Sequence, residues 1–232
     1  MFWPEDCRSF TNKLIFEMDT TALFSISYGL YIVGTMDGRR PVGCTINTCF
    51  QVTSENPLLA ISLNKNNYTL DAIRRNKRFS LSVVAEDTDN LIIATFGFSS
   101  SRTVDKYEDF GYRMLRDVPI VNGKFCSRLV LDAVNFVDCE THVVVVARLI
   151  DAVKEEGVPM TYEYYHRVVK GKAPKNAPTY VDEATVAKPA GSEGKRRYVC
   201  DICGYVVETD EPLPQDYVCP VCKADRSHFV EK

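Results

Sequence analysis

The pattern of apolar and polar positions between residues 20 and 169 predicts mainly β-strands with short helices between them. Six segments rich in Val, Ile, Thr and aromatic residues are bounded by turn signals such as Met36-Asp37-Gly38 and Asn56-Pro57. The predicted strands are residues 28–35, 41–53, 58–63, 79–85, 128–137 and 142–153. Six strands of this kind predict a closed or nearly closed β-barrel.

Two helices are predicted between these strands, at residues 68–76 and 87–96, because each segment places apolar side chains on one helical face. The last predicted strand is apolar on both faces over residues 143–147. We expect one face of this strand to pack inside the barrel and the other under a helix or a second subunit.

Length and composition predict one substantial globular domain and one very small domain. The chain has 232 residues, of which 45% are hydrophobic and 25% are charged. Its formal net charge of −3 argues against nucleic-acid binding, for which a basic stripe is expected. The longest apolar runs are too short to span a bilayer, and the start of the chain does not resemble a secretory leader. We therefore expect a cytoplasmic protein.

Two Cys-x-x-Cys pairs near the C-terminus give the strongest chemical signal. Cys200 and Cys203 form the first pair, Cys219 and Cys222 the second, and fifteen residues separate the pairs. Two thiolates three positions apart on a tight turn grip an ion from one side, so two facing turns complete a four-cysteine site. Such a site suits iron or zinc. Structural disulfides are the alternative, which the lack of a leader disfavours.

Four of the other five cysteines show no ligand spacing and are expected to act as small hydrophobic residues; they are Cys7, Cys44, Cys126 and Cys139. Between the two predicted domains, residues 170–197 hold three prolines, three glycines and no sustained period. We therefore divide the chain into an N-terminal extension (1–17), a barrel (18–169), a linker (170–197) and a small metal-binding domain (198–232).

Polar residues at two strand ends mark a candidate binding surface. Thr45, Asn47 and Cys49 alternate onto one face of the second predicted strand. The third strand runs into Asn64-Lys65-Asn66-Asn67, directly before the first predicted helix. A helix N-terminus with a capping Asn and a nearby Lys can bind an anion. An ordinary helix cap beside a solvated Lys is the alternative.

The segments YVCDICGYVV and PLPQDYVCPVC resemble rubredoxin, and the resemblance covers residues 198–232. It implies one iron, held by the four paired cysteines, that cycles between the ferric and ferrous states. Tyr217 and Lys223 stand where that family usually has Trp and Gly, and the gap between the pairs is shorter than in free rubredoxins. A zinc ribbon therefore remains as an alternative.

The runs SISYGLYIVGTMDG and GCTINTCFQVTSENPLLAISLNKNNYTLDAIRRNKRFSLSVV resemble the flavin reductase family of FMN-binding split barrels. The resemblance covers most of residues 20–169. It implies that Thr45, Asn47, Thr48 and Cys49 contact the flavin ring and ribityl chain. It also implies a phosphate end formed by Ser62, Asn64, Lys65, Asn67 and Thr69. Cys49 is expected to pack and to contribute its backbone, without acting as a nucleophile.

The later segment TYEYYHRVVKGKAPKNAPTY resembles the closing segment of the same family, which implies a position near the flavin for His166. A histidine satisfied by local hydrogen bonds is the alternative for this residue.

A flavin reductase-like barrel joined to a rubredoxin-like domain resembles the high molecular weight rubredoxins of anaerobic bacteria. The resemblance implies a homodimeric NAD(P)H-dependent oxidoreductase that reduces FMN and passes single electrons through iron to a flavodiiron oxygen or nitric oxide reductase. No G-x-G-x-x-G follows a predicted strand, so we expect the nicotinamide to bind over the flavin without a Rossmann domain.

Two alternatives to this function remain open. In one, the barrel reduces free flavin or ferric chelates and the metal domain is incidental. In the other, a zinc ribbon recruits a partner protein and carries no electrons.

Overall fold

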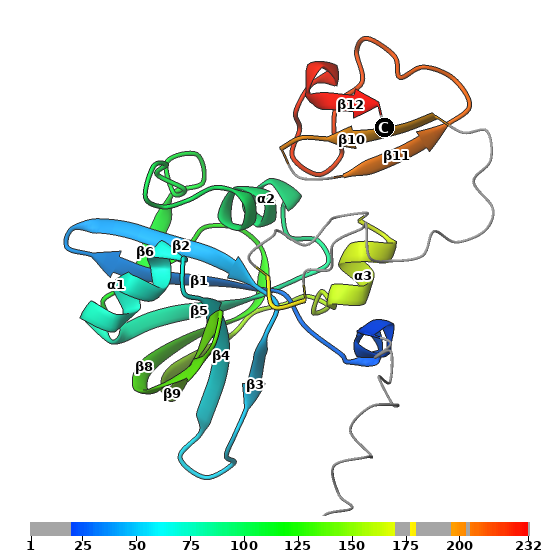
Figure 1. Cartoon of the computed structure of the whole chain (residues 1–232). Helices are drawn as coiled ribbons and strands as arrows, with labels where there is room; N and C mark the ends of the chain where they lie inside the picture. The colour runs from blue at the N-terminus through cyan, green and yellow to red at the C-terminus, as the bar shows by residue number, and fades with distance from the viewer. Residues whose placement is uncertain (1–19, 170–176, 180–195, 203–204, 232) are drawn as a thin grey trace, which may run out of the picture.

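The computed structural model describes residues 20–169, 177–179, 196–202 and 205–231 (Figure 1). The predicted N-terminal extension, most of the predicted linker and Cys203 lie outside these residues. The largest sheet of the described chain is antiparallel, with the strand order β2-β1-β5-β8-β9-β4-β3. Its strands are β1 (Tyr31–Asp37), β2 (Arg40–Ile46), β3 (Cys49–Gln51), β4 (Leu58–Asn64), β5 (Arg78–Val84), β8 (Phe125–Cys139) and β9 (His142–Lys154).

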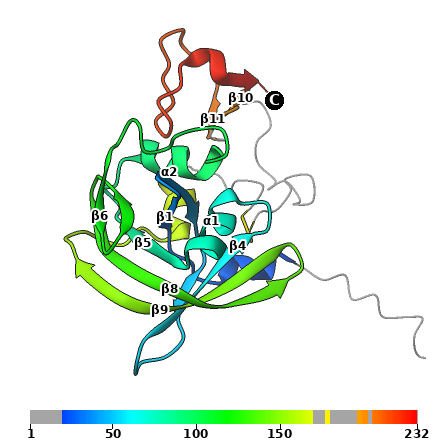
Figure 2. The same ribbon diagram turned by 90° about the vertical axis from the view of Figure 1, so that its left-hand side faces the viewer.

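The sheet is curled, and its two edge strands, β2 and β3, follow each other directly in the sequence. β2 ends at Ile46 and β3 begins at Cys49, so only Asn47 and Thr48 join the two edges. Register shifts at Val130/Leu131 and at Ala133/Asn135 accompany the bend of the long β8–β9 hairpin, as bulges do (Figure 2). The predicted mainly β split barrel is confirmed.

Some predicted elements were wrong in extent or missing. The predicted strand 41–53 is two strands, because the chain crosses from one edge of the split barrel to the other at Asn47. The short hairpin of β6 (Tyr112–Leu115) and β7 (Val118–Val121) and the helix α3 (Tyr162–Arg167) were not predicted. Each is too short to show a clear period.

Helix α1 (Tyr68–Asn76) has the predicted bounds, because Asn67 caps it by accepting a hydrogen bond from the Thr69 N–H at 3.0 Å. Helix α2 (Asn90–Phe98) begins three residues later than predicted, since the Asp89 carboxylate accepts the Leu91 N–H at 2.9 Å and fixes the start.

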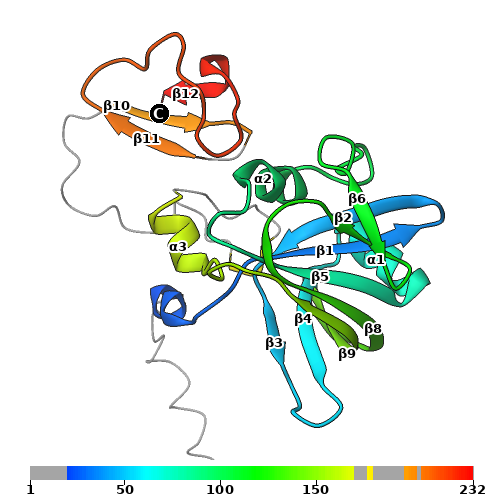
Figure 3. The ribbon, with the colours of Figure 1, turned by 180° about the vertical axis from the view of Figure 1, so that it is seen from behind.

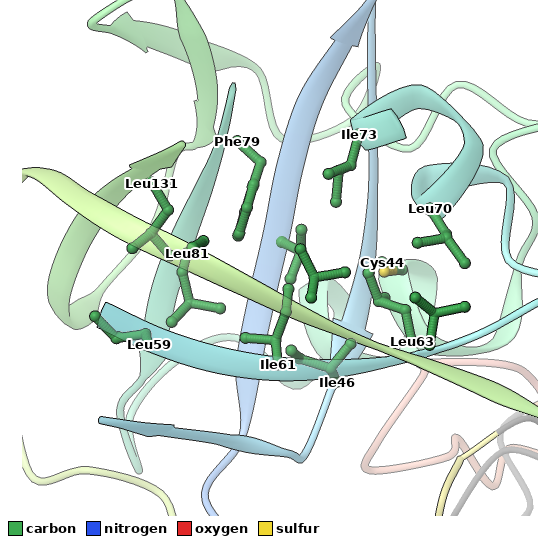
Figure 4. Packing of buried hydrophobic residues seen from close by; sticks show 14 residues of the cluster. Cys44, Ile46, Leu59, Ile61, Leu63, Leu70, Ile73, Phe79, Leu81 and Leu131 are labelled. Carbon is green, nitrogen blue, oxygen red and sulfur yellow. The ribbon is translucent and has the colours of Figure 1, made fainter. Parts of the chain in front are cut away.

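The main core lies between the concave face of the sheet and α1 (Figure 4). Phe79 and Leu81 of β5 meet Ile73 of α1 there, and all three are fully buried. Each such side chain contributes about 1.5–3 kcal/mol to folding. In β9, Val143, Val145 and Ala147 join this core, as expected for one face of that strand.

The C-terminal domain is a small sheet of β10 (Arg196–Cys200), β11 (Val206–Thr209) and β12 (Phe229–Glu231). A 3-10 turn at Arg226–His228 comes directly before β12. It lies over α2 in each view (Figures 1 to 3). Among the described helices, none has the length and apolar character needed to cross a membrane.

Candidate functional site

A cavity of about 120 Å³, partly open to solvent, lies at the end of the barrel. Its walls come from β2, β4, the start of α1, the end of α2, α3 and the segment 177–179. The lining combines apolar side chains with amides, hydroxyls and one lysine. This mixture of apolar and polar side chains is typical of sites for small organic cofactors.

The Asn47 side chain is held in one orientation at the end of β2. Its Nδ2 donates to Thr179 Oγ1 at 2.6 Å, and its Oδ1 accepts from the Thr48 hydroxyl at 3.0 Å. Thr179 Oγ1 donates in turn to the Tyr162 hydroxyl at 3.1 Å. Residue 47 is therefore tied to both α3 and the segment 177–179, and a fixed amide can recognise a planar heterocycle.

The structure brings several of the predicted phosphate-end residues together. Ser62, Asn64 and Asn67 line the cavity, and Thr69 is buried beside the Cys44 thiol. Lys65 lies outside the cavity lining, and its Nζ is 2.7 Å from an Asp138 carboxylate oxygen. This ion pair lowers the pKa of the Asp138 carboxyl.

The remaining predicted flavin contacts are placed as follows. Thr45 lines the cavity, and its hydroxyl donates to the Ile93 carbonyl at 3.0 Å, which attaches α2 to β2. Cys49 lies in β3 and packs against the main core. Burial raises the pKa of its thiol to about 12, so it is protonated at neutral pH. His166 packs edge-on against Tyr162, with ring centroids 4.2 Å apart.

Lys106 is a cavity residue that sequence reasoning missed. Its side chain is 3% exposed, and its ammonium donates to the Gly43 and Phe96 carbonyls, both at 2.9 Å. Burial lowers the pKa of Lys106 to about 8, so most of the population is charged at pH 7. No periodic pattern in the sequence predicts this residue, because a loop carries it into the interior.

A cation that lines a cavity together with the N-terminus of α1 suits an anionic ligand group. Gly43 makes this arrangement possible. An added Cβ at Gly43 would lie 2.5 Å from the Val33 carbonyl oxygen and 2.8 Å from the Phe96 ring. Only glycine lets β2, α2 and the Lys106 loop approach so closely.

The second candidate site lies in the C-terminal domain. Cys200, Cys219 and Cys222 are buried, and their sulfur atoms lie within 4.8 Å of one another. The Cys200 and Cys222 sulfurs are 3.6 Å apart, too far for a disulfide. This separation matches the edge of a tetrahedron with metal–sulfur bonds of about 2.3 Å. The predicted fourth ligand, Cys203, lies outside the described residues.

Aromatic side chains surround the three described thiols. Tyr198, Leu213 and Phe229 are buried in the same cluster as the cysteines, and Tyr217 packs edge-on against Phe229 at 5.1 Å. So small a domain cannot bury enough apolar surface by itself, and a metal held by these thiols would supply part of its stability.

Together these features define a split-barrel protein with a polar-lined cavity and a cysteine centre of the rubredoxin type. The chain belongs to the flavin reductase-like family, since the model of the "Flavin reductase like domain" matches residues 23–172. The model of the "Rubrerythrin, rubredoxin-like domain" matches residues 198–230. Both resemblances predicted from the sequence are confirmed.

One relative aligns with almost the whole chain, and another aligns over a share close to that of the barrel. The chain is 35% identical to high molecular weight rubredoxin from Moorella thermoacetica, over 92% of this chain and 100% of the relative. It is also 35% identical to a ferric-chelate reductase (NAD(P)H) from Archaeoglobus fulgidus, over 71% of this chain and 99% of that protein. The predicted resemblance to the high molecular weight rubredoxins is thus confirmed over the whole relative.

Solved structures share the barrel fold. An FMN-binding protein from Thermus thermophilus with bound 1-cyclohex-2-enone superposes with a TM-score of 0.53 at 22% identity, over 57% of this chain and 74% of that one. Flavin reductase PheA2 in its native state gives a TM-score of 0.54 at 18% identity, over 62% and 93% of the two chains.

Proposed function

We propose that this chain is an NAD(P)H-dependent oxidoreductase that reduces bound FMN and passes single electrons through a rubredoxin-type iron to a protein acceptor. The observation that carries the proposal is the pairing, in one chain, of the barrel cavity with the cysteine centre. The family supports flavin-dependent electron transfer, and the A. fulgidus relative is named for NAD(P)H.

The side chains that line the cavity suit FMN in chemistry and charge. Asn47 and Thr45 at the end of β2 would contact the ring and ribityl chain, and Tyr162 would close the wall from α3. Ser62 and Asn67, with the cation of Lys106, would hold the phosphate. Asn67 caps α1 by accepting the Thr69 N–H, so it lies beside the N–H groups of the first helical turn.

Flavin accepts the two electrons of a hydride and releases them singly, whereas a four-thiolate iron carries one electron at a time. Overall, one NAD(P)H and two ferric centres yield NAD(P)⁺, one proton and two ferrous centres. The role of the barrel residues is to orient the cofactor and exclude water. The role of the four cysteines is to hold the iron in a buried, apolar setting.

We further propose that the protein is a homodimer and that the acceptor is a flavodiiron oxygen or nitric oxide reductase. Support for the dimer comes from apolar side chains on the outer surface of the hairpin β8–β9, where Val134, Val137 and Ile150 are exposed, and from the exposed Phe50 of β3. The similarity to the M. thermoacetica relative along almost the whole chain supports the proposal of this acceptor.

A second candidate function is ferric-chelate reduction by the barrel alone. The A. fulgidus relative favours it, because it aligns over 71% of this chain, a share close to that of the barrel model at residues 23–172.

Anaerobic titration with NADH, followed at the absorption bands of both flavin and ferric thiolate, tests the proposal. We expect both bands to bleach, with one NADH consumed for every two iron equivalents reduced beyond the flavin. A flavin band that bleaches while the iron band persists would support the second candidate. Metal analysis showing zinc would support the zinc ribbon.

A further inference from the structure

Helix α2 separates the barrel cavity from the C-terminal domain. The domain lies directly over this helix in all three views (Figures 1 to 3). The α2 sequence NLIIATFGF is apolar at almost every position, so the helix needs cover on both sides. On the barrel side, Ile93 and Phe96 line the cavity and pack into the barrel.

On its other side, α2 packs against the cysteine centre. Ala94 is 3% exposed and belongs to the same buried cluster as Cys200, Cys219 and Cys222. Phe98 packs against that cluster. We call Ala94 and Phe98 the α2 platform.

Phe98 belongs to both sites. It lines the barrel cavity and also packs against the cluster that contains the three described thiols. A helix with its side chains is about 10–12 Å across, so the cavity and the cysteine cluster are separated by one helix thickness. Rates of electron transfer fall steeply with distance, and this separation is short.

The platform is rigidly attached to the barrel. The Thr45 hydroxyl donates to the Ile93 carbonyl at 3.0 Å, and Lys106 Nζ donates to the Phe96 carbonyl at 2.9 Å. Both bonds fix α2 through residues that themselves line the cavity. A change at the cavity therefore acts on the helix that carries the platform.

We infer that the α2 platform is the docking surface for the rubredoxin-like domain, and that Phe98 is the positioning residue that joins the cysteine centre to the flavin cavity. The inference rests on the proposed function and specifies where the two centres meet. The occupant is a part of the same chain, residues 196–202 and 205–231, already seated on the platform. The contact uses two α2 side chains among the described residues, so a tethered domain can dock there and leave again to meet an acceptor.

The first test measures docking without electron transfer. The full-length chain is loaded with zinc in place of iron, without flavin, and the rotational correlation time of the C-terminal domain is measured by NMR. In the wild type this domain should tumble with the barrel. Ala94→Arg should release it, so that it tumbles as a small unit. Val104→Arg, at an exposed position outside the cluster, is the matched control and should leave it docked.

The second test measures iron reduction in the iron-loaded chain at saturating FMN, by stopped flow after addition of NADH. Ala94→Arg should slow iron reduction by about tenfold or more, because the released domain then relies on the tether alone. Reduction of FMN by NADH should keep its wild-type rate, since Ala94 does not line the cavity.

Phe98 variants separate packing from general damage. Phe98→Ala should weaken docking and slow iron reduction, and Phe98→Leu, which keeps an apolar contact, should restore docking. Phe110→Ala removes an aromatic ring that packs in the barrel cluster, outside the cysteine cluster, and should change neither measurement.

Two results would overturn the inference: a wild-type domain that tumbles freely, or an Ala94→Arg chain that reduces iron at the wild-type rate although the domain is released. If the domain docks but iron is never reduced in the wild type, the proposed function fails and the docking surface stands.

Discussion

The Asn47 amide donates a 2.6 Å hydrogen bond to the Thr179 hydroxyl, across 132 residues of sequence. This bond joins the point where the barrel sheet splits to the stretch of chain that leads to the metal domain. Because the same hydroxyl bonds Tyr162, the first residue of α3 is held in the same network. The wall of the cavity thus depends on a contact between distant segments.

Loss of this contact should weaken flavin binding. Thr179→Val removes the hydroxyl but keeps the shape, and leaves Asn47 free to turn. We expect the FMN dissociation constant to rise about two- to tenfold, the usual effect of one lost hydrogen bond. Fluorescence titration of FMN measures it. Thr53→Val, whose hydroxyl contacts Asn56 away from the cavity, is the control. Unchanged FMN affinity in Thr179→Val would contradict a role for the network.

Lys106 should make FMN binding depend on pH. In the free chain, burial lowers the pKa of this ammonium to about 8, so the cation is lost as the pH rises through that value. A bound phosphate favours the charged form, and FMN affinity should therefore decline above about pH 8. Riboflavin, which has no phosphate, should not show this decline.

Lys106→Met tests that assignment. It should weaken FMN binding at pH 7 and remove the decline above pH 8, while changing riboflavin affinity much less. Isothermal titration of both ligands between pH 6.5 and 9.5 is the measurement, within the range where Lys106 changes charge. Equal losses for FMN and riboflavin would place Lys106 away from the phosphate.

Lys65 offers a parallel test of the phosphate end. It pairs with Asp138 in the described structure, and turning toward a phosphate would break that pair. We expect Lys65→Ala to weaken FMN by about 1–3 kcal/mol and to spare riboflavin. Asp138→Asn should instead tighten FMN binding, because it frees Lys65. If both substitutions leave FMN affinity unchanged, Lys65 acts elsewhere.

Substitution of two glycines, Gly43 beside α2 and Gly97 within it, should change the stability of the fold in opposite directions. Gly43→Ala places a methyl group 2.5 Å from the Val33 carbonyl oxygen and should destabilise the fold by about 1–3 kcal/mol. Gly97→Ala meets its nearest neighbour, Thr45, at 3.5 Å and should stabilise α2 by up to about 1 kcal/mol. Urea unfolding of both variants measures the difference. Equal stability would mean that Gly43 is not needed for close approach.

Local signals predicted much of the fold. The bounds of α1 follow from the Asn67 cap and the apolar period, and most strands follow from their β-branched residues. The prediction of one continuous strand at residues 41–53 was wrong, because a two-residue period cannot show where a sheet splits. At Asn47 the chain changes sheet edge, which only the closed topology determines.

The site was predicted in part for the same reason. Asn67 and Ser62 lie beside elements with clear local signals, and both line the cavity. Lys106 reaches the cavity through a contact with Gly43 over 63 residues. Thr179 bonds the cavity residue Asn47 over 132 residues. A lysine in a polar loop sequence gives no sign that its charge is buried, so the position of Lys106 could be found only from the structure.

The order of electron flow is the central claim, and Cys219→Ser tests it most directly. Cys219 is fully buried among the described thiols, and a serine oxygen is a poor substitute for a soft thiolate, so the iron centre should be lost. NADH consumption is then measured with two acceptors, a ferric chelate and a purified flavodiiron reductase. We predict that ferric-chelate reduction keeps its wild-type rate while delivery to the flavodiiron reductase collapses. Delivery to that protein at the wild-type rate would contradict the account and show that the iron centre is not on the path.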